Sequence, residues 1–282
     1  MKQNIILSIK DYRAQLPKSE QKIADYILDN TNEVITLSAQ ELAKKAASSP
    51  AAIIRFCHSI NVNGFTELKL LLSANLGSMA TDMYTEVEKD ESVEAIKQKL
   101  NVRFVHAVER TADLLDERNI TEVFELIEQA ELIFVYGLGA SSLVAQDIHQ
   151  KFTRLGKNVF CTLDHHLFAS AMGTTKGKSL FIAVSNSGET RELISLLSIA
   201  AENGIPTIGI TQNEQSTVAK YSDIVLLTAK GEEAPLRSAA TVSLIAQMYV
   251  VDVLFFLYAS SNYDETLEHI QQSRKTVGQL KQ

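Results

Sequence analysis

From residue 132 onward, short apolar runs alternate with segments of helical character, and this alternation restricts the fold more than any other feature of the chain. Five runs have the length of buried strands: Leu132–Tyr136, Asn158–Leu163, Leu180–Val184, Thr207–Ile210 and Ile224–Leu227. Helical segments between them predict parallel strands, because parallel neighbours need a crossover and the crossover helices cover both faces of the sheet. The expected fold of this part is an α/β three-layer sandwich with a five-stranded parallel sheet.

The helices that belong to this domain flank and connect the strands. Two are expected before the first strand, at Ser92–Leu115 and Ile120–Ala130. The others are Ser141–Leu155, Glu189–Asn203, a short helix near Gln215–Tyr221, Ser238–Ala259 and Asp264–Leu280. We therefore assign residues 92–282 to one α/β domain.

The first 77 residues have no strand pattern and instead predict short amphipathic helices. Ser38 and Glu41 have the spacing of a capping box in front of Ala39–Ala46. Ser49 can cap a helix that has Pro50 at its first position and runs to about residue 60. Other helices are expected at Asn4–Leu16, from Pro17, and from Gly64 to Leu72. We predict an all-α domain at residues 1–77 and a polar, acidic linker at residues 78–91.

Charge is unevenly divided between the two predicted domains. The chain carries −7 overall, but residues 1–77 carry +2 and the remainder −9. A mildly basic domain on an acidic body permits nucleic-acid binding by the first domain alone. Cys57 and Cys161 lie outside any metal-ligand spacing and are expected to be reduced. The longest apolar runs are far shorter than the ~20 residues that span a bilayer, so we expect a cytoplasmic protein without a membrane partner.

Residues 39–46 and 50–60 predict two helices joined by a tight turn, the arrangement of a DNA-binding helix-turn-helix. Four apolar positions of the second helix have helical spacing and are expected in the core: Ile53, Phe56, Cys57 and Ile60. The predicted DNA contacts are Ser49, Ala51, Ala52, Arg55 and His58 toward base edges, and Lys44, Lys45 and Lys69 toward phosphates. A purely structural helical bundle has the same pattern and stays open as the alternative.

Two predicted strand ends carry small and hydroxyl-bearing residues that open a helix. They are residues 136–142, after the first strand, and 185–190, after the third. Free N–H groups at a helix N-terminus stabilise an anion, and both corners belong at the carboxyl edge of the sheet, where ligands bind in such folds. The predicted anion-binding residues are Gly139, Ser141, Ser185, Ser187, Gly188 and Thr190. Capping of their own helices is the alternative role for these hydroxyls.

Three further residues are weaker candidates for the same pocket: Ser142, Asp164 and His165. Asp164-His165-His166 follows the second strand and either lines the pocket or forms an exposed loop. The adjacent histidines have no third ligand at a suitable spacing, so we expect no metal. Residues 173–179 precede a strand instead of following one, which argues against a nucleotide-binding P-loop. No catalytic residue and no cofactor is predicted.

The same segments resemble a known family. The runs Leu37–Ala43, Ser49–Cys57 and Gly64–Lys69, with Leu16–Leu28 before them, resemble the N-terminal domain of RpiR-type transcriptional regulators. The two glycine- and serine-rich corners resemble the SIS (sugar isomerase) domain, the phosphosugar-binding half of these regulators. Together the two resemblances cover nearly the whole chain.

This resemblance implies a function and roles for particular residues. It implies a regulator of carbohydrate metabolism that binds double-stranded operator DNA as a homo-oligomer, a homodimer or homotetramer, and responds to a phosphorylated sugar. It also implies that Ser185, Ser187 and Thr190 hold the phosphate, with Ser141 near the sugar. The long apolar helix at Ser238–Ala259 either supplies part of the dimer interface or is buried against its own sheet.

The chain departs from the family pattern at several positions of the helix-turn-helix. Ala47 replaces the usual turn glycine, which costs ~1 kcal/mol if the residue needs a positive φ. Ser48 replaces an apolar residue, Ala52 a threonine and His58 a basic residue. Asn61 replaces another glycine, and asparagine tolerates the left-handed conformation.

Two other functions stay open on the sequence. The first is a sugar-phosphate isomerase with an accessory helical domain, which needs a base that neither corner supplies. Glu232 and Glu233, in a predicted loop, are the acids considered for that role. The second is a dinucleotide sensor, since Gly137 and Gly139 resemble the start of a Rossmann fingerprint. Ser142 stands in place of its third glycine.

The weakly polar recognition helix predicts weak DNA binding by a single N-terminal domain. With alanine at positions 51 and 52 and few cations nearby, few contacts to bases and phosphates are available. We expect the isolated fragment 1–77 to bind selected operator DNA well above nanomolar dissociation constants, and oligomerisation of the full chain to compensate. A gel shift with this fragment tests the expectation, and a nanomolar shift would contradict it.

Overall fold

The computed structural model describes residues 5–76, 89–230 and 240–280. The chain forms two compact units, which divide between His106 and Ala107 inside helix α7 (Val93–Leu114). The predicted boundary at residue 92 precedes this division. Most of the predicted linker, 78–91, lies outside the described residues, as do Glu232 and Glu233.

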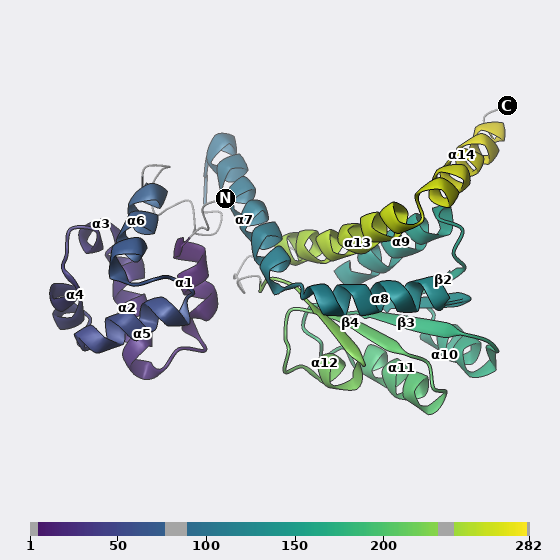
Figure 1. The fold of residues 1–282 in the computed structure, drawn as a ribbon, viewed down its shortest axis with the longest axis horizontal. Helices are drawn as coiled ribbons and strands as arrows, with labels where there is room; N and C mark the ends of the chain where they lie inside the picture. The colour runs from purple at the N-terminus through teal and green to yellow at the C-terminus, as the bar shows by residue number, and fades with distance from the viewer. Residues whose placement is uncertain (1–4, 77–88, 231–239, 281–282) are drawn as a thin grey trace. The chain divides into compact units, whose positions relative to one another are not determined.

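The described part of the first unit is helical, as predicted (Figure 1). Its helices before α7 are α1 (Ile5–Arg13), α2 (Lys18–Asp29), α3 (Thr31–Val34), α4 (Ala39–Lys45), α5 (Pro50–Ser59) and α6 (Phe65–Leu76). One apolar core unites them, and the four core positions predicted for α5 are all fully buried: Ile53, Phe56, Cys57 and Ile60. Helix α3 was not predicted, because four residues are too few to show helical periodicity.

The two helices of the helix-turn-helix begin where their caps predict. The Ser38 hydroxyl accepts a hydrogen bond from the Glu41 N–H at 3.2 Å, and the Glu41 carboxylate accepts one from the Ser38 N–H at 2.7 Å, a complete capping box. The Ser49 hydroxyl accepts from the Ala52 N–H at 3.2 Å in front of Pro50. These contacts fix the start of α4 and of α5, and α5 packs against α4 and α2.

The turn between α4 and α5 does require a left-handed residue. Ala47 has φ +46°, and Asn61, after α5, has φ +58°. Asparagine adopts this conformation readily, but alanine does so only at a cost in free energy. Ala47 therefore strains the backbone at the turn position where the resemblance implied a glycine.

The second unit contains the predicted parallel sheet. Its strands are β1 (Leu132–Gly137), β2 (Val159–Cys161), β3 (Ser179–Val184), β4 (Thr207–Thr211) and β5 (Ile224–Leu227). They pair in the order β2-β1-β3-β4-β5, with every neighbouring pair parallel. All five predicted strands are confirmed, and β2 is shorter than its apolar run.

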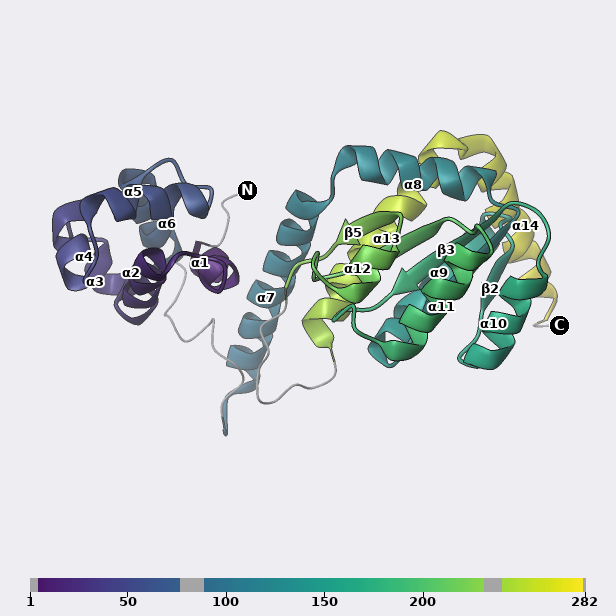
Figure 2. The same ribbon diagram turned by 90° about the horizontal axis from the view of Figure 1, so that it is seen from below.

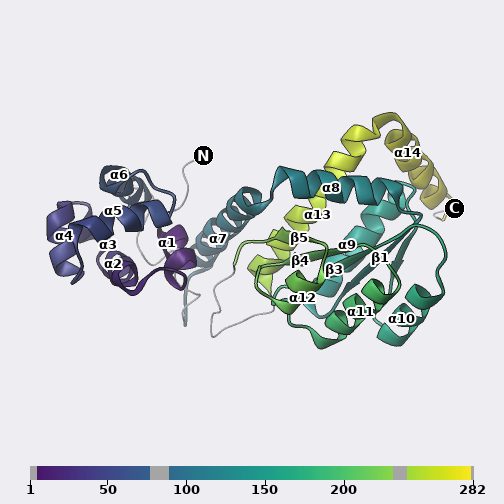
Figure 3. The ribbon, with the colours of Figure 1, turned by 60° about the horizontal axis from the view of Figure 1, so that its bottom comes forward.

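Helices cover both faces of the sheet and complete the three layers (Figures 1 and 3). One face carries α8 (Glu117–Gln129), α9 (Ala140–Arg154) and α13 (Thr241–Ser261). The other carries α10 (His165–Thr174), α11 (Arg191–Glu202) and α12 (Thr217–Tyr221). Helix α14 (Tyr263–Gln279) follows α13 and contacts α9 near the β2 end of the sheet (Figure 2).

Helix α13 is long and apolar enough to cross a membrane by length and mean hydropathy alone. Its position accounts for that composition. Val250, Val251 and Leu254 lie in the core between α13 and the sheet, and the Asp252 carboxylate pairs with the Lys151 ammonium of α9 at 2.6 Å. Burial against its own sheet therefore explains much of the apolar character of α13.

Ala47→Gly should stabilise the first unit, because glycine removes the Cβ from a left-handed residue. The conformation costs an L-residue ~1–2 kcal/mol, and the extra entropy of glycine in the unfolded chain offsets part of the gain, which leaves ~0.5–1 kcal/mol. Native-state hydrogen exchange of the α4 and α5 amides in the full chain measures this difference. The matched control, Ala51→Gly at an exposed position inside α5, should instead lower stability by ~1 kcal/mol. Equal effects of the two changes would refute the strain at Ala47.

Candidate functional site

The pairing of β1 with β3 brings the two predicted corners together. Gly137 is in register with Val184, so the residues that follow each strand leave the sheet side by side. The chain then turns to α9 on one face and to α11 on the other face. This divergence is the topological switch point of a doubly wound sheet, the place where such folds bind ligands.

The first corner is built around two glycines. A Cβ on Gly137 would lie 2.5 Å from the Ser141 carbonyl oxygen, so only glycine fits beneath the first turn of α9. Gly139 has φ +58° and begins the helix. Ser141 is buried and its hydroxyl donates to the Gln247 side-chain oxygen at 3.4 Å. The Ser142 hydroxyl donates to the Gly139 carbonyl at 2.6 Å.

The second corner is held in a tight loop by its own hydroxyls. The buried Ser185 hydroxyl accepts from the Gly188 N–H at 3.0 Å and shares a hydrogen bond with the Thr190 hydroxyl, also at 3.0 Å. The exposed Ser187 hydroxyl accepts from the Glu189 N–H at 3.2 Å. These hydroxyls therefore bond within their own loop and do not cap α11, which was their alternative role.

Glu189 anchors this loop to the neighbouring helix α12. Its carboxylate accepts from the Thr217 N–H at 2.9 Å and from the Thr217 hydroxyl at 2.7 Å. These hydrogen bonds, led by that from the side chain, hold the pKa of Glu189 below its usual value. Gly188 packs against the same helix, and a Cβ on it would lie 2.1 Å from the Ser216 hydroxyl. No local sequence pattern indicates this contact between Glu189 and Thr217.

The two helices that begin at the switch point lack side-chain caps; of the other helices of this unit, α8, α10 and α12 have such caps, and α13 and α14 do not. No side chain caps α9 at Gly139 or α11 at Thr190. Asp116, Asp164 and Ser216 cap α8, α10 and α12. The first N–H groups of a helix need a partner, and a bound anion supplies one. The uncapped helix ends therefore coincide with the predicted anion site.

Gln247 is a polar residue of this site that sequence reasoning missed. It lies on α13, is 2% exposed, and its side-chain nitrogen has no hydrogen-bond partner within the described part of the chain. Its oxygen accepts the Ser141 hydroxyl. A buried amide donor without a partner is costly unless water or a ligand satisfies it. The sequence does mark Gln247 as unusual, because it is a polar residue within the apolar helix α13.

The weaker candidates Asp164 and His165 are exposed, as the alternative to a pocket position predicted, but they lie at the start of helix α10 and not within a loop. Asp164 caps α10 by accepting from the Leu167 N–H at 3.0 Å, and this hydrogen bond lowers the pKa of the Asp164 carboxyl. His165 is exposed and its ring lies 4.6 Å from that of His166. Among the described residues no group of three or more His, Cys, Asp or Glu side chains could hold a metal ion.

The exposed face of α5 differs from the predicted DNA-binding face at one position. Ala51, Arg55 and His58 are exposed as predicted, but Ala52 is 1% exposed and belongs to the core. Ala52 stands four residues before Phe56 and so shares its buried side. Ile54, which was not predicted, is 54% exposed on the outer face. The prediction of Ala52 as a DNA contact is therefore wrong.

The predicted phosphate contacts are unequally available. Lys44 is exposed, while the Lys45 ammonium pairs with Glu33 at 2.6 Å. The Lys69 ammonium donates to the Leu37 carbonyl at 3.1 Å and lies 5.4 Å from the centre of the Phe65 ring. Lys69 therefore makes contacts within the first unit that a phosphate contact would have to replace.

Arg55 lies beside a buried acid. Its guanidinium is 3.8 Å from the carboxylate of Glu20, which is 4% exposed, while the Arg55 side chain is 60% exposed. The Ser59 hydroxyl also donates to Glu20, at 2.8 Å. Glu20 therefore lies beside the Nε atom of Arg55, and much of the Arg55 side chain stays exposed to solvent.

Two family models match the chain. A helix-turn-helix domain of the rpiR family matches residues 3–79, and the SIS domain matches residues 126–257. The uncharacterized HTH-type transcriptional regulator YbbH of Bacillus subtilis is 35% identical over 97% of this chain and 96% of its own length. A second uncharacterized HTH-type regulator, TTE0211 of Caldanaerobacter subterraneus, is 34% identical over 99% and 98%.

Solved structures have the same fold. The NanR protein of Vibrio vulnificus, complexed with ManNAc-6P, superposes with a TM-score of 0.62 at 27% identity and covers 98% of this chain and 99% of its own. The sugar isomerase domain of an RpiR transcription factor from Sphaerobacter thermophilus superposes with a TM-score of 0.57 at 24% identity, over 64% of this chain and 98% of its own.

Gly188→Ala should destabilise the second unit more than Gly204→Ala. Both glycines have positive φ, at +70° and +65°, so each change adds a conformational cost of ~1–2 kcal/mol. A Cβ at Gly204 has nothing within 4 Å, but one at Gly188 collides with Ser216 and should add ~1–3 kcal/mol. Urea unfolding of the full-length variants measures the difference, and equal losses would show that the Gly188 loop is not packed tightly on α12.

Proposed function

The chain belongs to the RpiR family of helix-turn-helix transcriptional regulators with a SIS domain, and we propose that a phosphorylated sugar, bound at its sheet's switch point, controls its DNA binding. The observation that carries this proposal is the pair of uncapped helix N-termini, α9 and α11, at adjacent strand ends. A dianionic phosphate satisfies unpaired N–H groups and interacts favourably with both helix dipoles.

The residues proposed to bind the ligand come from both corners. Ser185, Ser187 and Thr190 surround the phosphate, and Gly188 allows its close approach. Gly139 and Ser141 lie on the α9 side, where the unpartnered amide of Gln247 can donate to a sugar hydroxyl. Binding requires the bond between Ser185 and Thr190 to open, so that their hydroxyls turn to the ligand. The ManNAc-6P in NanR supports a phosphorylated sugar as the ligand class.

We propose binding without catalysis. Sugar-phosphate isomerisation needs a base whose pKa is near the working pH. Asp164 and Glu189 are carboxylates of the strand-end loops, but each caps or anchors a helix, and the pKa of each is lowered by those hydrogen bonds. A lowered pKa makes a carboxylate a weaker base. The curated relatives are likewise named as transcriptional regulators.

The α5 face is the proposed reading surface for operator DNA. The proposed contacts to the bases are Ser49, Ala51, Arg55 and His58. The proposed contacts to the phosphates are Lys44, Lys45 and Lys69. The regulated genes are those of carbohydrate metabolism, and the protein acts in the cytoplasm. Sugar binding changes operator affinity by a coupling free energy of ~1–3 kcal/mol, as is typical of allosteric proteins.

A thermal-shift screen of the full chain against sugar phosphates, free sugars and inorganic phosphate tests the proposal. A phosphorylated sugar at about 100 times its dissociation constant should stabilise the protein by ~2.7 kcal/mol. Free sugars should have no effect at the same concentration, because the phosphate supplies most of the binding. Stabilisation by free sugars alone, or by no sugar phosphate at millimolar concentration, would refute the site.

Ser187→Ala tests whether the loop at residues 185–190 binds the phosphate. It removes one hydrogen bond to a charged group, worth ~1.5–3 kcal/mol, and should weaken sugar-phosphate binding about 10- to 100-fold. Ser195→Ala is the matched control, since Ser195 is exposed on helix α11, which follows the loop of Ser187, and donates to the Arg191 carbonyl. Calorimetric titration compares the two variants, and similar affinities would place the phosphate elsewhere.

A further inference from the structure

A buried carboxylate lies beside the proposed DNA-reading face of α5. Within residues 5–76, 89–230 and 240–280, Glu20 on α2 is the only aspartate or glutamate that is buried. A carboxylate that loses its hydration is costly unless a cation or hydrogen-bond donors compensate it. The partners of Glu20 therefore indicate what this acid does.

Both partners of the Glu20 carboxylate are on α5, four residues apart. Its Oε2 atom accepts a hydrogen bond from the Ser59 hydroxyl at 2.8 Å, and its Oε1 atom lies 3.8 Å from Nε of Arg55. Residues four positions apart share one face of a helix, so one carboxylate reaches both. Ser59 thus fixes the position of the acid, and Arg55 supplies the opposite charge.

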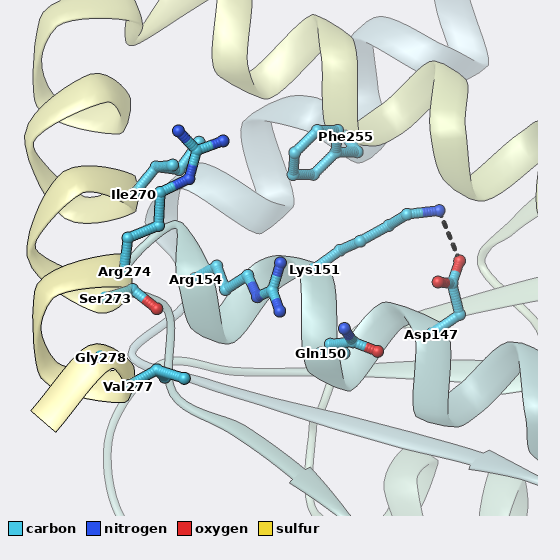
Figure 4. A pocket seen from close by; sticks show the side chains of 10 residues that line it. All are labelled: Asp147, Gln150, Lys151, Arg154, Phe255, Ile270, Ser273, Arg274, Val277 and Gly278. Carbon is cyan, nitrogen blue, oxygen red and sulfur yellow. Dashed lines mark hydrogen bonds and ion pairs between the residues drawn. The ribbon is translucent and has the colours of Figure 1, made fainter. Parts of the chain in front are cut away.

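The ion pair between Glu20 and Arg55 joins a buried group to an exposed one. The Glu20 side chain is 4% exposed and the Arg55 side chain 60%. The ion pair between Lys151 and Asp147 on α9, which Figure 4 shows, instead joins groups of similar exposure, 25% and 21%. Arg55 therefore has a fixed acid beside its Nε atom, while most of its side chain is open to contact from outside.

Arg55 also has a position in α5 that suits contact with a base edge. Ala51, one turn before it, is exposed and small, so no bulky neighbour on that side covers the arginine. The first turns of a recognition helix enter the major groove, where guanine presents two acceptors, O6 and N7. One arginine can bind both acceptors, and with Glu20 beside Nε the two terminal NH2 groups remain for them.

We propose that Glu20 is a positioning residue, which directs Arg55 to a guanine of the operator and away from its phosphates. This inference rests on the proposed DNA binding and adds which base is read and by what arrangement. The neighbouring carboxylate restricts the conformations of the arginine, so less entropy is lost when the arginine binds the base. It also offsets the guanidinium charge, which lowers the gain from phosphate contacts, whereas the paired hydrogen bonds to O6 and N7 remain.

Glu20→Gln in the full chain tests the proposal on DNA that wild type has first selected from random sequences. In wild type, replacing the guanine that Arg55 reads should weaken binding about 5- to 150-fold, the range of one bidentate contact. Glu20→Gln should remove most of this preference. It should also strengthen binding to unrelated duplex DNA and steepen the plot of log K against log salt by up to about 0.9, because Arg55 becomes free to contact one phosphate.

Fluorescence anisotropy with labelled duplexes at several salt concentrations measures both quantities. A merely structural role of Glu20 would weaken binding to selected and unrelated DNA alike, so changes in opposite directions identify positioning. An unchanged guanine preference, or weaker binding to all DNA by a variant that circular dichroism shows to be folded, would overturn the proposal.

Asp25→Asn is the matched control. Asp25 lies on the same helix α2, and its carboxylate accepts a hydrogen bond from Nη2 of Arg13 at 3.0 Å. The change thus removes the same charge and the partner of a different arginine. It should leave the guanine preference as in wild type, and any gain in binding to unrelated DNA measures the effect of net charge alone. Equal preferences and equal salt dependence in Asp25→Asn and Glu20→Gln would contradict a particular role for Glu20.

Two further variants decide the outcome if Glu20→Gln does not fold. Ser59→Ala removes the hydrogen bond that fixes the carboxylate and should lower the guanine preference several-fold. Arg55→Lys keeps the charge but cannot form the bidentate contact, so it should abolish the preference. If Arg55→Lys retains the preference, or Ser59→Ala leaves it unchanged, the inference is wrong while DNA binding by the chain stands. If wild type selects no sequence, the proposed function fails as well.

Discussion

The register between β1 and β3 is the constraint on which the functional architecture of the second unit depends. Because Gly137 is level with Val184, the two loops leave the sheet at the same height and turn to opposite faces. A shift of one residue would turn the buried side chains of either strand to the wrong face, so the register is secured by the whole core. The position of the proposed anion site therefore follows from packing, and the loop residues determine only what can bind there.

Much of this arrangement could be predicted because apolar runs, caps and glycines carry local information. All five strands and the capping box at Ser38 follow from patterns within a few residues. Helix α10 was not predicted, although its cap, Asp164, was noted as a polar residue after β2. The N-terminal helix α3 contains too few residues for periodicity to indicate it.

Contacts that depend on tertiary packing could not be predicted in this way. Gln247 and Ser141 are hydrogen-bonded although they lie 106 positions apart in the sequence, and a pattern of neighbouring residues cannot predict such a contact. The anchoring of Glu189 on Thr217 joins two connections that follow different strands. Ala52 is a different case, since its separation of four residues from Phe56 already placed it on the core side of α5.

Two helix N-termini without side-chain caps, and one buried side-chain amide without a partner in the described chain, meet at the switch point; such donors cost free energy unless water or a ligand satisfies them. Side chains cap α8, α10 and α12 in the same unit, and each such cap contributes ~0.5–2 kcal/mol. At α9 and α11 the capping positions hold Gly139 and a threonine whose hydroxyl is bonded to Ser185 instead. The buried amide of Gln247 adds a further unmatched donor. In the proposed function, a ligand that supplies acceptors at these positions recovers this stabilisation on binding, and the recovered free energy is what the domain uses to respond to the ligand.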